Sequence, residues 1–229
     1  MTVANGVDGM KALILGDSGG IGAALCQALR DRGAEVTGRS RRDGLDLTDE
    51  ASVAATARDL AGQRFDLIVN AAGALTIGGS APEKSLAALD PAAMAAQFAL
   101  NATGVAIALK HLSPLLASDR RAVFGSLSAR LGSIGDNRAG GWISYRAAKA
   151  AQNQIIRTAA IEIARRTPGA IVVALHPGTV ATALSAPYRG RHPAITAAQS
   201  AQALLTVIDR LTPADNGGFR DWKGLPVPW

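Results

Sequence analysis

The sequence predicts an α/β fold, a doubly wound parallel sheet with helices on both faces, and two observations predict it. Short apolar runs, such as Leu13-Ile14-Leu15 before Gly16, are typical of buried parallel strands. Longer segments between them have helical features, such as residues 91–117, which Asp90-Pro91 opens. Because strand and helix alternate without a linker or a repeat, we expect one domain over residues 1–229.

Each expected element has its own boundary signals. Gly33 follows the first helix, Thr48 could cap the second, and Pro168-Gly169 closes the longest one. The expected strands are residues 11–16, 35–38, a very short 45–47, 66–70, 122–127, 171–175 and 219–222. The expected helices are residues 21–32, 49–61, 91–117, 143–166 and 196–211. Ligands of such sheets bind beyond the carboxyl ends of the strands, where the motifs below fall.

Composition and charge narrow the class of protein. The single cysteine, Cys26, excludes an internal disulfide and provides no metal-binding cluster. No apolar run approaches 18 residues and no apolar leader opens the chain, so we expect a cytoplasmic protein without a membrane. A net charge of +6 raises nucleic-acid binding as an alternative. Only Arg39, Arg41 and Arg42 cluster, without interleaved aromatics, so we expect no nucleic-acid partner.

A glycine-rich turn, Gly-Asp-Ser-Gly-Gly-Ile-Gly at residues 16–22, joins the first strand to the first helix. Glycines allow a tight turn and close approach of the backbone to a pyrophosphate, and the helix N-terminus offers unpaired N–H groups. The turn therefore predicts a dinucleotide site. Its candidate cofactor-binding residues are Gly16, Ser18, Gly20, Ile21 and Gly22.

Tyr145 and Lys149 are four residues apart in the expected helix 143–166. Side chains with this spacing share one helix face, with their Cβ atoms about 5–6 Å apart. A free tyrosine has a pKa near ~10, and a lysine beside it favours the phenolate. The pair could then act as a general acid and base near neutral pH. The same spacing also occurs on solvated helix faces, so the other motifs decide its meaning.

The spacing Gly16-x-x-x-Gly20-x-Gly22 resembles the turn of the short-chain dehydrogenase/reductase family, with Leu15 in place of the usual threonine. The resemblance implies a Rossmann-type domain that binds NAD(P). Gly38 ends the second strand where an acidic residue would select NAD, and Arg39 follows it. A guanidinium there can bind the 2′-phosphate, which is the family's NADP pattern, so we expect NADPH or NADP rather than NADH.

The resemblance implies roles for several further motifs. Asn101, within a helix, would hold a water that links the lysine to solvent. The implied cofactor contacts are Asp46 and Leu47 at the adenine, Asn70, Ala71, Ala72 and Gly73 beneath the cofactor, Tyr145 and Lys149 at the nicotinamide end, and Pro177, Gly178, Val180 and Thr182 at the carboxamide.

The family also places a serine after the fifth strand to hydrogen-bond the substrate. We assign it to Ser128, with Ser126 and Ser133 as alternatives. The separation of Ser128 from Tyr145 exceeds the family's usual spacing, which an insertion within residues 135–141 would explain. Counting back from Gly132 by the usual interval reaches Ala129 instead. This stretch looks like that of the C-factor-like subgroup.

Together the motifs predict an NADP(H)-dependent enzyme that reduces a carbonyl, or oxidises the alcohol, of a small, apolar substrate. Ser128 and Tyr145 would polarise the carbonyl, Tyr145 would give the proton, and Lys149 would lower the pKa of Tyr145 and hold the nicotinamide ribose. The alternative is a non-catalytic dinucleotide-binding sensor or signalling protein on the same fold. The apolar tail, with two of the three tryptophans, predicts a homodimer or homotetramer.

Overall fold

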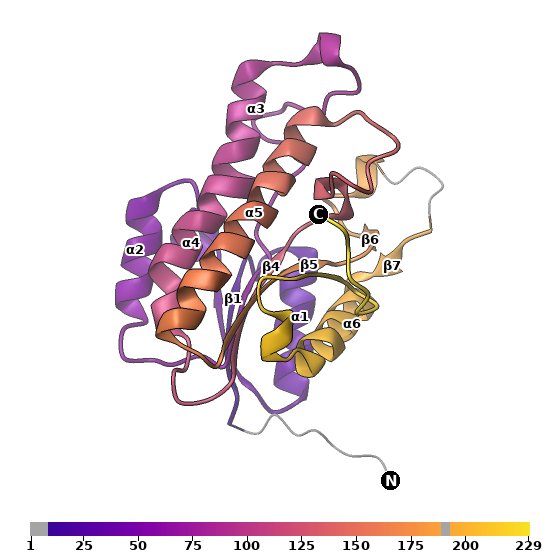
Figure 1. The fold of residues 1–229 in the computed structure, drawn as a ribbon. Helices are drawn as coiled ribbons and strands as arrows, with labels where there is room; N and C mark the ends of the chain where they lie inside the picture. Colours follow the sequence, from indigo (N-terminus) through magenta and orange to yellow (C-terminus); the bar gives the residue numbers. More distant parts are fainter. Residues whose placement is uncertain (1–8, 189–192) are drawn as a thin grey trace.

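The computed structural model describes residues 9–188 and 193–229, and a six-stranded parallel sheet forms its centre (Figure 1). The strand order is β2-β1-β3-β4-β5-β8. The strands are β1 (Lys11–Leu15), β2 (Glu35–Arg39), β3 (Leu67–Asn70), β4 (Ala122–Leu127), β5 (Ala170–His176) and β8 (Phe219–Asp221). The chain runs outward from β1 to β2 and then returns to place β3 on the other side of β1. This reversal creates the crevice in which such sheets bind ligands.

Helices cover both faces of the sheet, as expected (Figure 1). One face packs against α1 (Gly20–Asp31) and α6 (Ala197–Arg210), through an apolar cluster that includes Leu25 and Leu204. The other face packs against α2 (Glu50–Asp59), α4 (Gly104–Leu112) and α5 (Ile143–Arg166). The central strands β3 and β4 are buried along their whole length, which explains why their sequences are apolar rather than alternating. A small parallel pair, β6 (Val180–Ala181) and β7 (Ile195–Thr196), lies beyond the end of β5.

The expected short strand at residues 45–47 is wrong. Leu45 and Leu47 are both buried, but the backbone there forms local contacts instead of pairing with a strand. The Leu45 N–H donates to the Ser40 carbonyl at 3.0 Å, and the Asp46 N–H donates to the Ser52 hydroxyl at 2.9 Å. Two buried leucines therefore indicated burial rather than strand structure.

The second helix begins one residue later than expected, and its cap is Asp49 rather than Thr48. The Asp49 carboxylate accepts a hydrogen bond from the Ala51 N–H at 2.9 Å, which satisfies one of the free donors of the first turn. The next helix, α3 (Pro91–Phe98), has the predicted start, because Asp90 caps it and Pro91 occupies its first turn.

The helix expected at 91–117 is divided into four consecutive elements. A π turn over Ala99–Thr103 separates α3 from α4, and a short 3₁₀ turn, Ser113–Leu115, follows α4. By length and composition alone, Pro91–Leu115 is the one described segment that could cross a membrane. Within this segment, Val105, Ala108 and Leu112 are buried and belong to the core cluster that covers one face of the sheet.

The C-terminal tail packs back on its own chain. The Trp229 carbonyl accepts a hydrogen bond from the Gly135 N–H at 2.8 Å, and the Trp229 ring stacks on Phe219 with centroids 5.8 Å apart. Val227 is buried in the same core cluster as Phe219, and its N–H donates to the Phe219 carbonyl at 2.9 Å. The tail thus contacts the segment after β4 at Gly135, and the homo-oligomer stays a prediction.

Candidate active site

The glycine turn after β1 is closed so tightly that two of its glycines have no room for a side chain. A Cβ on Gly22 would lie 2.1 Å from the Gly16 carbonyl oxygen, and a Cβ on Gly16 would lie 2.8 Å from the Ala72 nitrogen. Gly16 also has a left-handed φ of 83°. Gly19, the N-cap of α1, contributes no side-chain cap, so the first N–H groups of α1 are available to an anion.

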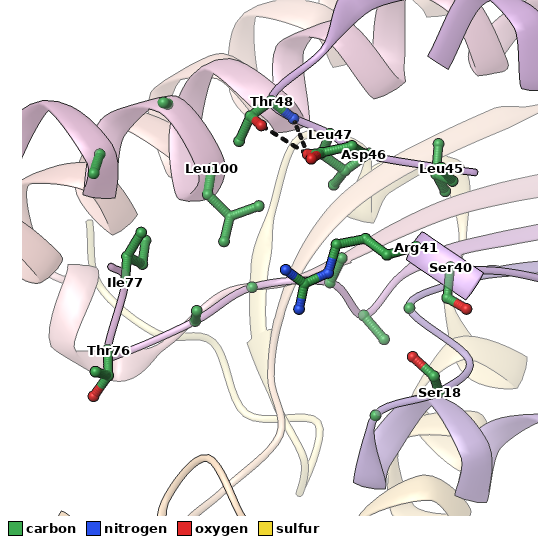
Figure 2. Close-up of a pocket in the computed structure, with 18 of the residues that line it drawn as sticks. Ser18, Ser40, Arg41, Leu45, Asp46, Leu47, Thr48, Thr76, Ile77 and Leu100 are labelled. Carbon is green, nitrogen blue, oxygen red and sulfur yellow. Dashed lines mark hydrogen bonds between the residues drawn. The ribbon is translucent and has the colours of Figure 1, made fainter. Parts of the chain in front are cut away.

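A cavity of about 600 Å³ lies beside this turn, at the carboxyl ends of β1, β2 and β3 (Figure 2). Seven of the predicted cofactor residues line it, namely Gly16, Ser18, Asp46, Leu47, Ala71, Ala72 and Gly73. Several other lining residues were not predicted from the sequence, above all Gly19, Ser40, Leu45, Thr48, Thr76, Ile77 and Leu100. Small residues and short apolar side chains form much of this surface, which suits a flat ring system.

Two arginines near the end of β2 differ in their relation to the cavity. Arg39 is the last residue of the strand, its guanidinium donates to the Gly38 carbonyl at 2.9 Å, and it does not line the cavity. By contrast, Arg41 lines the cavity, and its side chain extends from the backbone beside Ser40 towards the middle of the cavity (Figure 2). The strand runs one residue further than expected, to Arg39, and Arg41 follows it as a second candidate for the 2′-phosphate.

Gly38 also has a different role from the one expected. A Cβ on Gly38 would lie 2.2 Å from Oδ2 of Asp17, so the glycine makes room for the Asp17 side chain. The Asp17 carboxylate is therefore packed under the glycine turn, against β2.

At the far side of the cavity, Asp46 is held in one orientation. Its Oδ1 accepts hydrogen bonds from the Thr48 N–H at 2.8 Å and from the Thr48 hydroxyl at 2.7 Å, as Figure 2 shows. These hydrogen bonds lower the pKa of the Asp46 carboxyl. Leu47 beside it is buried against Gly104, whose missing side chain leaves the space that Leu47 fills.

The turn after β3 is set by Asn70, which is fully buried. Its side-chain oxygen accepts from the Ala72 N–H at 3.1 Å, and its side-chain nitrogen donates to the Ser126 hydroxyl at 3.3 Å. Asn70 itself does not line the cavity. It fixes the path of Ala71, Ala72 and Gly73, which do.

The turn after β5 approaches the glycine turn from the opposite side. A Cβ on Gly20 would lie 2.8 Å from Cγ2 of Thr182, so the two turns are in contact. The Ser200 hydroxyl donates to the Pro177 carbonyl at 2.8 Å, and Gly178 has a left-handed φ of 85°. Val180 is buried, which anchors this turn. Seven further predicted cofactor residues belong to these two turns and do not line the cavity, namely Gly20, Ile21, Gly22, Pro177, Gly178, Val180 and Thr182.

Tyr145 and Lys149 lie on α5 and are both buried. The Lys149 ammonium lies 5.8 Å from the centre of the Tyr145 ring. It donates to the Leu127 carbonyl at 3.0 Å and to the Gln152 side-chain oxygen at 2.8 Å. Gln152 is fully buried and was not assigned from the sequence, because an amide in a helix of mixed polarity carries no distinguishing signal.

Burial changes the acid–base chemistry of this pair. It raises the pKa of the Tyr145 phenol above its usual value and lowers the pKa of Lys149 to about 7. Burial thus opposes the effect on the Tyr145 pKa that is expected of Lys149, because loss of water disfavours the charged form of each group. At neutral pH the phenol is protonated and can act as an acid.

Asn101 lies in the π turn and connects the helix to the loop after β3. Its amide donates to the Ala74 carbonyl at 2.9 Å and to the Gln97 side chain at 2.7 Å. A Cβ on Gly73 would lie 3.0 Å from Asn101 Oδ1 and 3.6 Å from Lys149 Nζ, so both groups face the same point. The π turn thus brings a predicted site residue towards the lysine, as π turns at functional sites often do.

All three candidate serines are buried and hydrogen-bonded. Ser128 donates to the Asn153 side-chain oxygen at 2.6 Å. Ser126 accepts from Gln152 at 2.9 Å, and Ser133 accepts from the Asp136 N–H at 3.1 Å. The Ser128 hydrogen is therefore directed to Asn153, which leaves its lone pairs as the free side of the hydroxyl.

His176 is the last residue of β5 and its ring faces the backbone of Arg130. Burial and the nearby Arg130 guanidinium lower its pKa to about 4, so the ring is neutral at physiological pH. Its Nδ1 accepts from the Arg130 N–H at 3.3 Å.

Glu83 caps the helix that carries Tyr145, although it is 61 residues away from that helix's first turn in the sequence. Its carboxylate accepts from the Ser144 N–H and the Ser144 hydroxyl, both at 2.6 Å. The Glu83 carbonyl also accepts from the Trp142 N–H at 2.6 Å. Trp142, the N-cap of α5, makes no side-chain cap of its own. The loop after β3 therefore fixes the start of α5.

Replacing Glu83 with alanine should destabilise the fold at neutral pH by about 1 kcal/mol, the usual cost of a lost cap. Burial alone would raise the Glu83 pKa, but the two hydrogen bonds from Ser144 outweigh it and lower the pKa. The contribution of the carboxylate to the free energy of unfolding is therefore fully present above its unfolded-state pKa. It is lost as the pH falls through its pKa in the folded protein. Urea unfolding of both proteins at pH 7 and pH 4 measures this. If the difference in the free energy of unfolding between the two proteins is as large at pH 4 as at pH 7, the role of the charge is contradicted.

Comparison with known proteins assigns the chain to a family. Residues 42–215 match the family model described as enoyl-(acyl carrier protein) reductase. The chain is 32% identical to 1-hydroxy-2-glutathionyl-2-methyl-3-butene dehydrogenase of Rhodococcus sp. strain AD45, over 95% of this chain and 98% of that protein. It is 34% identical to the C-signal protein of Myxococcus xanthus, over 63% of this chain and 84% of that protein.

Solved structures share the fold at lower identity. A short-chain dehydrogenase/reductase of Burkholderia multivorans with bound NADP superposes with a TM-score of 0.81 at 24% identity, covering 96% of this chain and 99% of that one. The NADPH-bound carbonyl reductase from chicken fatty liver gives a TM-score of 0.80 at 24% identity, covering 97% and 100%.

Proposed function

The chain belongs to the short-chain dehydrogenase/reductase family, and on that premise we propose that it is an NADPH-dependent reductase of small, apolar carbonyl compounds. The observation that carries the proposal is the buried pair of Tyr145 and Lys149, whose ammonium would lie 3.6 Å from a Cβ on Gly73, a residue that lines the cavity beside the glycine turn. The same site would oxidise the corresponding alcohol when the cofactor is oxidised. Two curated relatives, from Rhodococcus and Sinomonas cyclohexanicum, are named as dehydrogenases.

The residues of the cavity fit a dinucleotide. The N–H groups at the start of α1 would bind the pyrophosphate, Asp46 and Leu47 would flank the adenine, and the small turn after β3 would leave room for the cofactor to lie flat. When bound, the cofactor supplies the hydride.

The protein's own residues would then handle the proton and the orientation of the substrate. The Tyr145 phenol, which burial keeps protonated, would donate its proton to the carbonyl oxygen. Lys149 would hold the nicotinamide ribose, and Asn101 would support the return of the proton from solvent. Ser128 would assist once its hydroxyl turns from Asn153 towards the substrate.

We expect the protein to oxidise NADPH in the presence of an aldehyde, a ketone or a quinone from a small panel. Loss of absorbance at the NADPH wavelength measures the reaction, and a reaction mixture without protein is the blank. Failure of every carbonyl, together with unimpaired binding of NADPH, would favour the alternative function below.

Preference for NADPH should depend on Arg41. Replacing Arg41 with alanine should weaken NADPH binding by roughly 10- to 100-fold, because a charge-assisted contact to the 2′-phosphate is lost, and should leave NADH binding nearly unchanged. Fluorescence titration of both cofactors measures the two affinities. Arg39→Ala is the matched control, since its guanidinium binds the Gly38 carbonyl outside the cavity. A larger effect at Arg39 than at Arg41 would restore the assignment made from the sequence.

A second candidate function is a dinucleotide-binding signalling protein, which the likeness to the C-signal protein favours. Such a protein would need the cavity for the dinucleotide but not the Tyr145 phenol. The two functions therefore differ in whether the phenol matters once the cofactor is bound.

A further inference from the structure

Three consecutive residues before α5 have left-handed backbones: Gly140 (φ 63°), Gly141 (φ 66°) and Trp142 (φ 53°). Among the residues that the structure describes, Trp142 is the one non-glycine residue with a positive φ. A bulky side chain disfavours this conformation, whereas glycine would adopt it freely. Strain of this kind persists where the surroundings enforce it, and it clusters at functional sites.

The surroundings of Trp142 do enforce it. Its N–H donates to the Glu83 carbonyl at 2.6 Å. The Arg146 guanidinium, from the first turn of α5, donates to the Gly141 carbonyl at 2.9 Å and to the Gly140 carbonyl at 3.1 Å. The backbone of this turn is thus fixed by contacts that a glycine at position 142 would keep. The indole itself must account for the presence of tryptophan.

The indole lies between two tyrosines. Its ring centre is 6.3 Å from that of Tyr145, at an interplanar angle of 79°, and 5.2 Å from that of Tyr188, at 73°. The Tyr188 hydroxyl is 2.5 Å from the Thr76 hydroxyl, and Thr76 lines the cofactor cavity. Three edge-to-face rings therefore connect the proton-donating phenol to the rim of the cavity.

We propose that Trp142 and Tyr188 are specificity-determining residues that select carbonyl substrates whose carbonyl is conjugated to a flat ring. The inference rests on the proposed reductase function, because it places the substrate beside Tyr145. Aromatic rings attract one another through their faces and edges at separations of about 4.5–7 Å, and a saturated ring of equal size lacks this interaction. Leu184, on the same segment as Tyr188, is half exposed and adds an apolar contact.

The test compares two substrates of the same size, benzaldehyde and cyclohexanecarbaldehyde, in the wild type and in Trp142→Gly. We expect the kcat/KM for benzaldehyde divided by the kcat/KM for cyclohexanecarbaldehyde to fall by about 10-fold or more in the variant. Glycine suits the left-handed backbone, so the variant should remain folded, and its thermal unfolding checks this. A ratio unchanged in a folded variant would overturn the proposal.

Two further variants separate the rings from the hydrogen bond. Tyr188→Phe and Thr76→Val remove the same hydrogen bond from its two ends and keep both rings. Each should leave the ratio within about 2-fold of the wild type, whereas Tyr188→Leu should lower it as Trp142→Gly does. A fall in Tyr188→Phe as large as in Tyr188→Leu would contradict selection by the ring.

A binding experiment separates this inference from the proposed function. Benzyl alcohol and cyclohexylmethanol cannot react with NADPH, so calorimetry with the protein–NADPH complex measures their affinities without turnover. Tighter binding of benzyl alcohol, lost in Trp142→Gly, supports the proposal, and equal affinities in the wild type would overturn it. If NADPH does not bind, the proposed function fails. The same two titrations of the protein alone still show whether the aromatic alcohol binds more tightly than the saturated one.

Discussion

Replacing Tyr145 with phenylalanine should lower kcat for carbonyl reduction by about 10³-fold, the contribution expected of a positioned general acid. The change removes one hydroxyl from a buried ring and keeps the ring's packing against Trp142. Binding of NADPH should therefore stay nearly constant while the chemical step slows. Single-turnover measurements of NADPH oxidation, with a separate titration of NADPH, show the two effects independently.

The pH dependence of the two reaction directions tests the same role of Tyr145. Because burial raises the pKa of the Tyr145 phenol, the acid form dominates at neutral pH, and reduction should decline only in strongly alkaline solution. Oxidation of the alcohol needs the phenolate and should rise with pH. Ser128→Ala is the control: its hydrogen is directed to Asn153, so its loss should cost less than the loss of the phenol. A Tyr145→Phe enzyme as fast as the wild type would remove the mechanism and favour the signalling function.

The second large effect is expected at the glycine turn. A Cβ at position 22 would lie 2.1 Å from the Gly16 carbonyl oxygen and 3.1 Å from the Asp17 Cα, all of them backbone contacts that no side-chain rotation relieves. Gly22→Ala should therefore destabilise the protein by about 3 kcal/mol and move the N–H groups that would bind the pyrophosphate. Denaturant unfolding and NADPH titration measure the two consequences.

Gly19→Ala is the matched control for this change, because both residues belong to the same turn. A Cβ on Gly19 would meet only the Gly16 carbonyl oxygen, at 3.3 Å, and the φ of Gly19 is an ordinary −83°. Its effect on stability should be within about 1 kcal/mol. Equal losses at the two positions would show that glycine is needed throughout the turn rather than where the chain closes on itself.

The fold could be predicted because its signals are local. Buried parallel strands are short apolar runs, and helices such as α3 are opened by residues with a known capping role, Asp90 and Pro91. The same logic failed at residues 45–47, where two buried leucines lie in an irregular segment. In a run of only three residues, a buried irregular segment and a buried strand have the same apolar pattern.

The site was harder to predict, because it depends on boundaries and on distant contacts. Arg41, beyond the end of β2, lines the cavity and Arg39 does not, although both belong to the same basic cluster in the sequence. The cap of α5 comes from Glu83 in another loop, and no local pattern indicates such a partner. Burial raises the pKa of the Tyr145 phenol, and spacing along a helix cannot show how deeply a side chain is buried.

The π turn at Ala99–Thr103 has a consequence for how this protein can vary. The π turn holds one residue more than the α turn that it replaces, so deleting one residue there would restore a continuous α-helix and leave the faces of α3 and α4 in register. Gly104 would still meet Leu47 and α4 would still cover the sheet, but Asn101 would lose the wide turn that places its amide at the Ala74 carbonyl. A relative that lacks one residue in this segment should therefore keep the fold and lose the present position of Asn101.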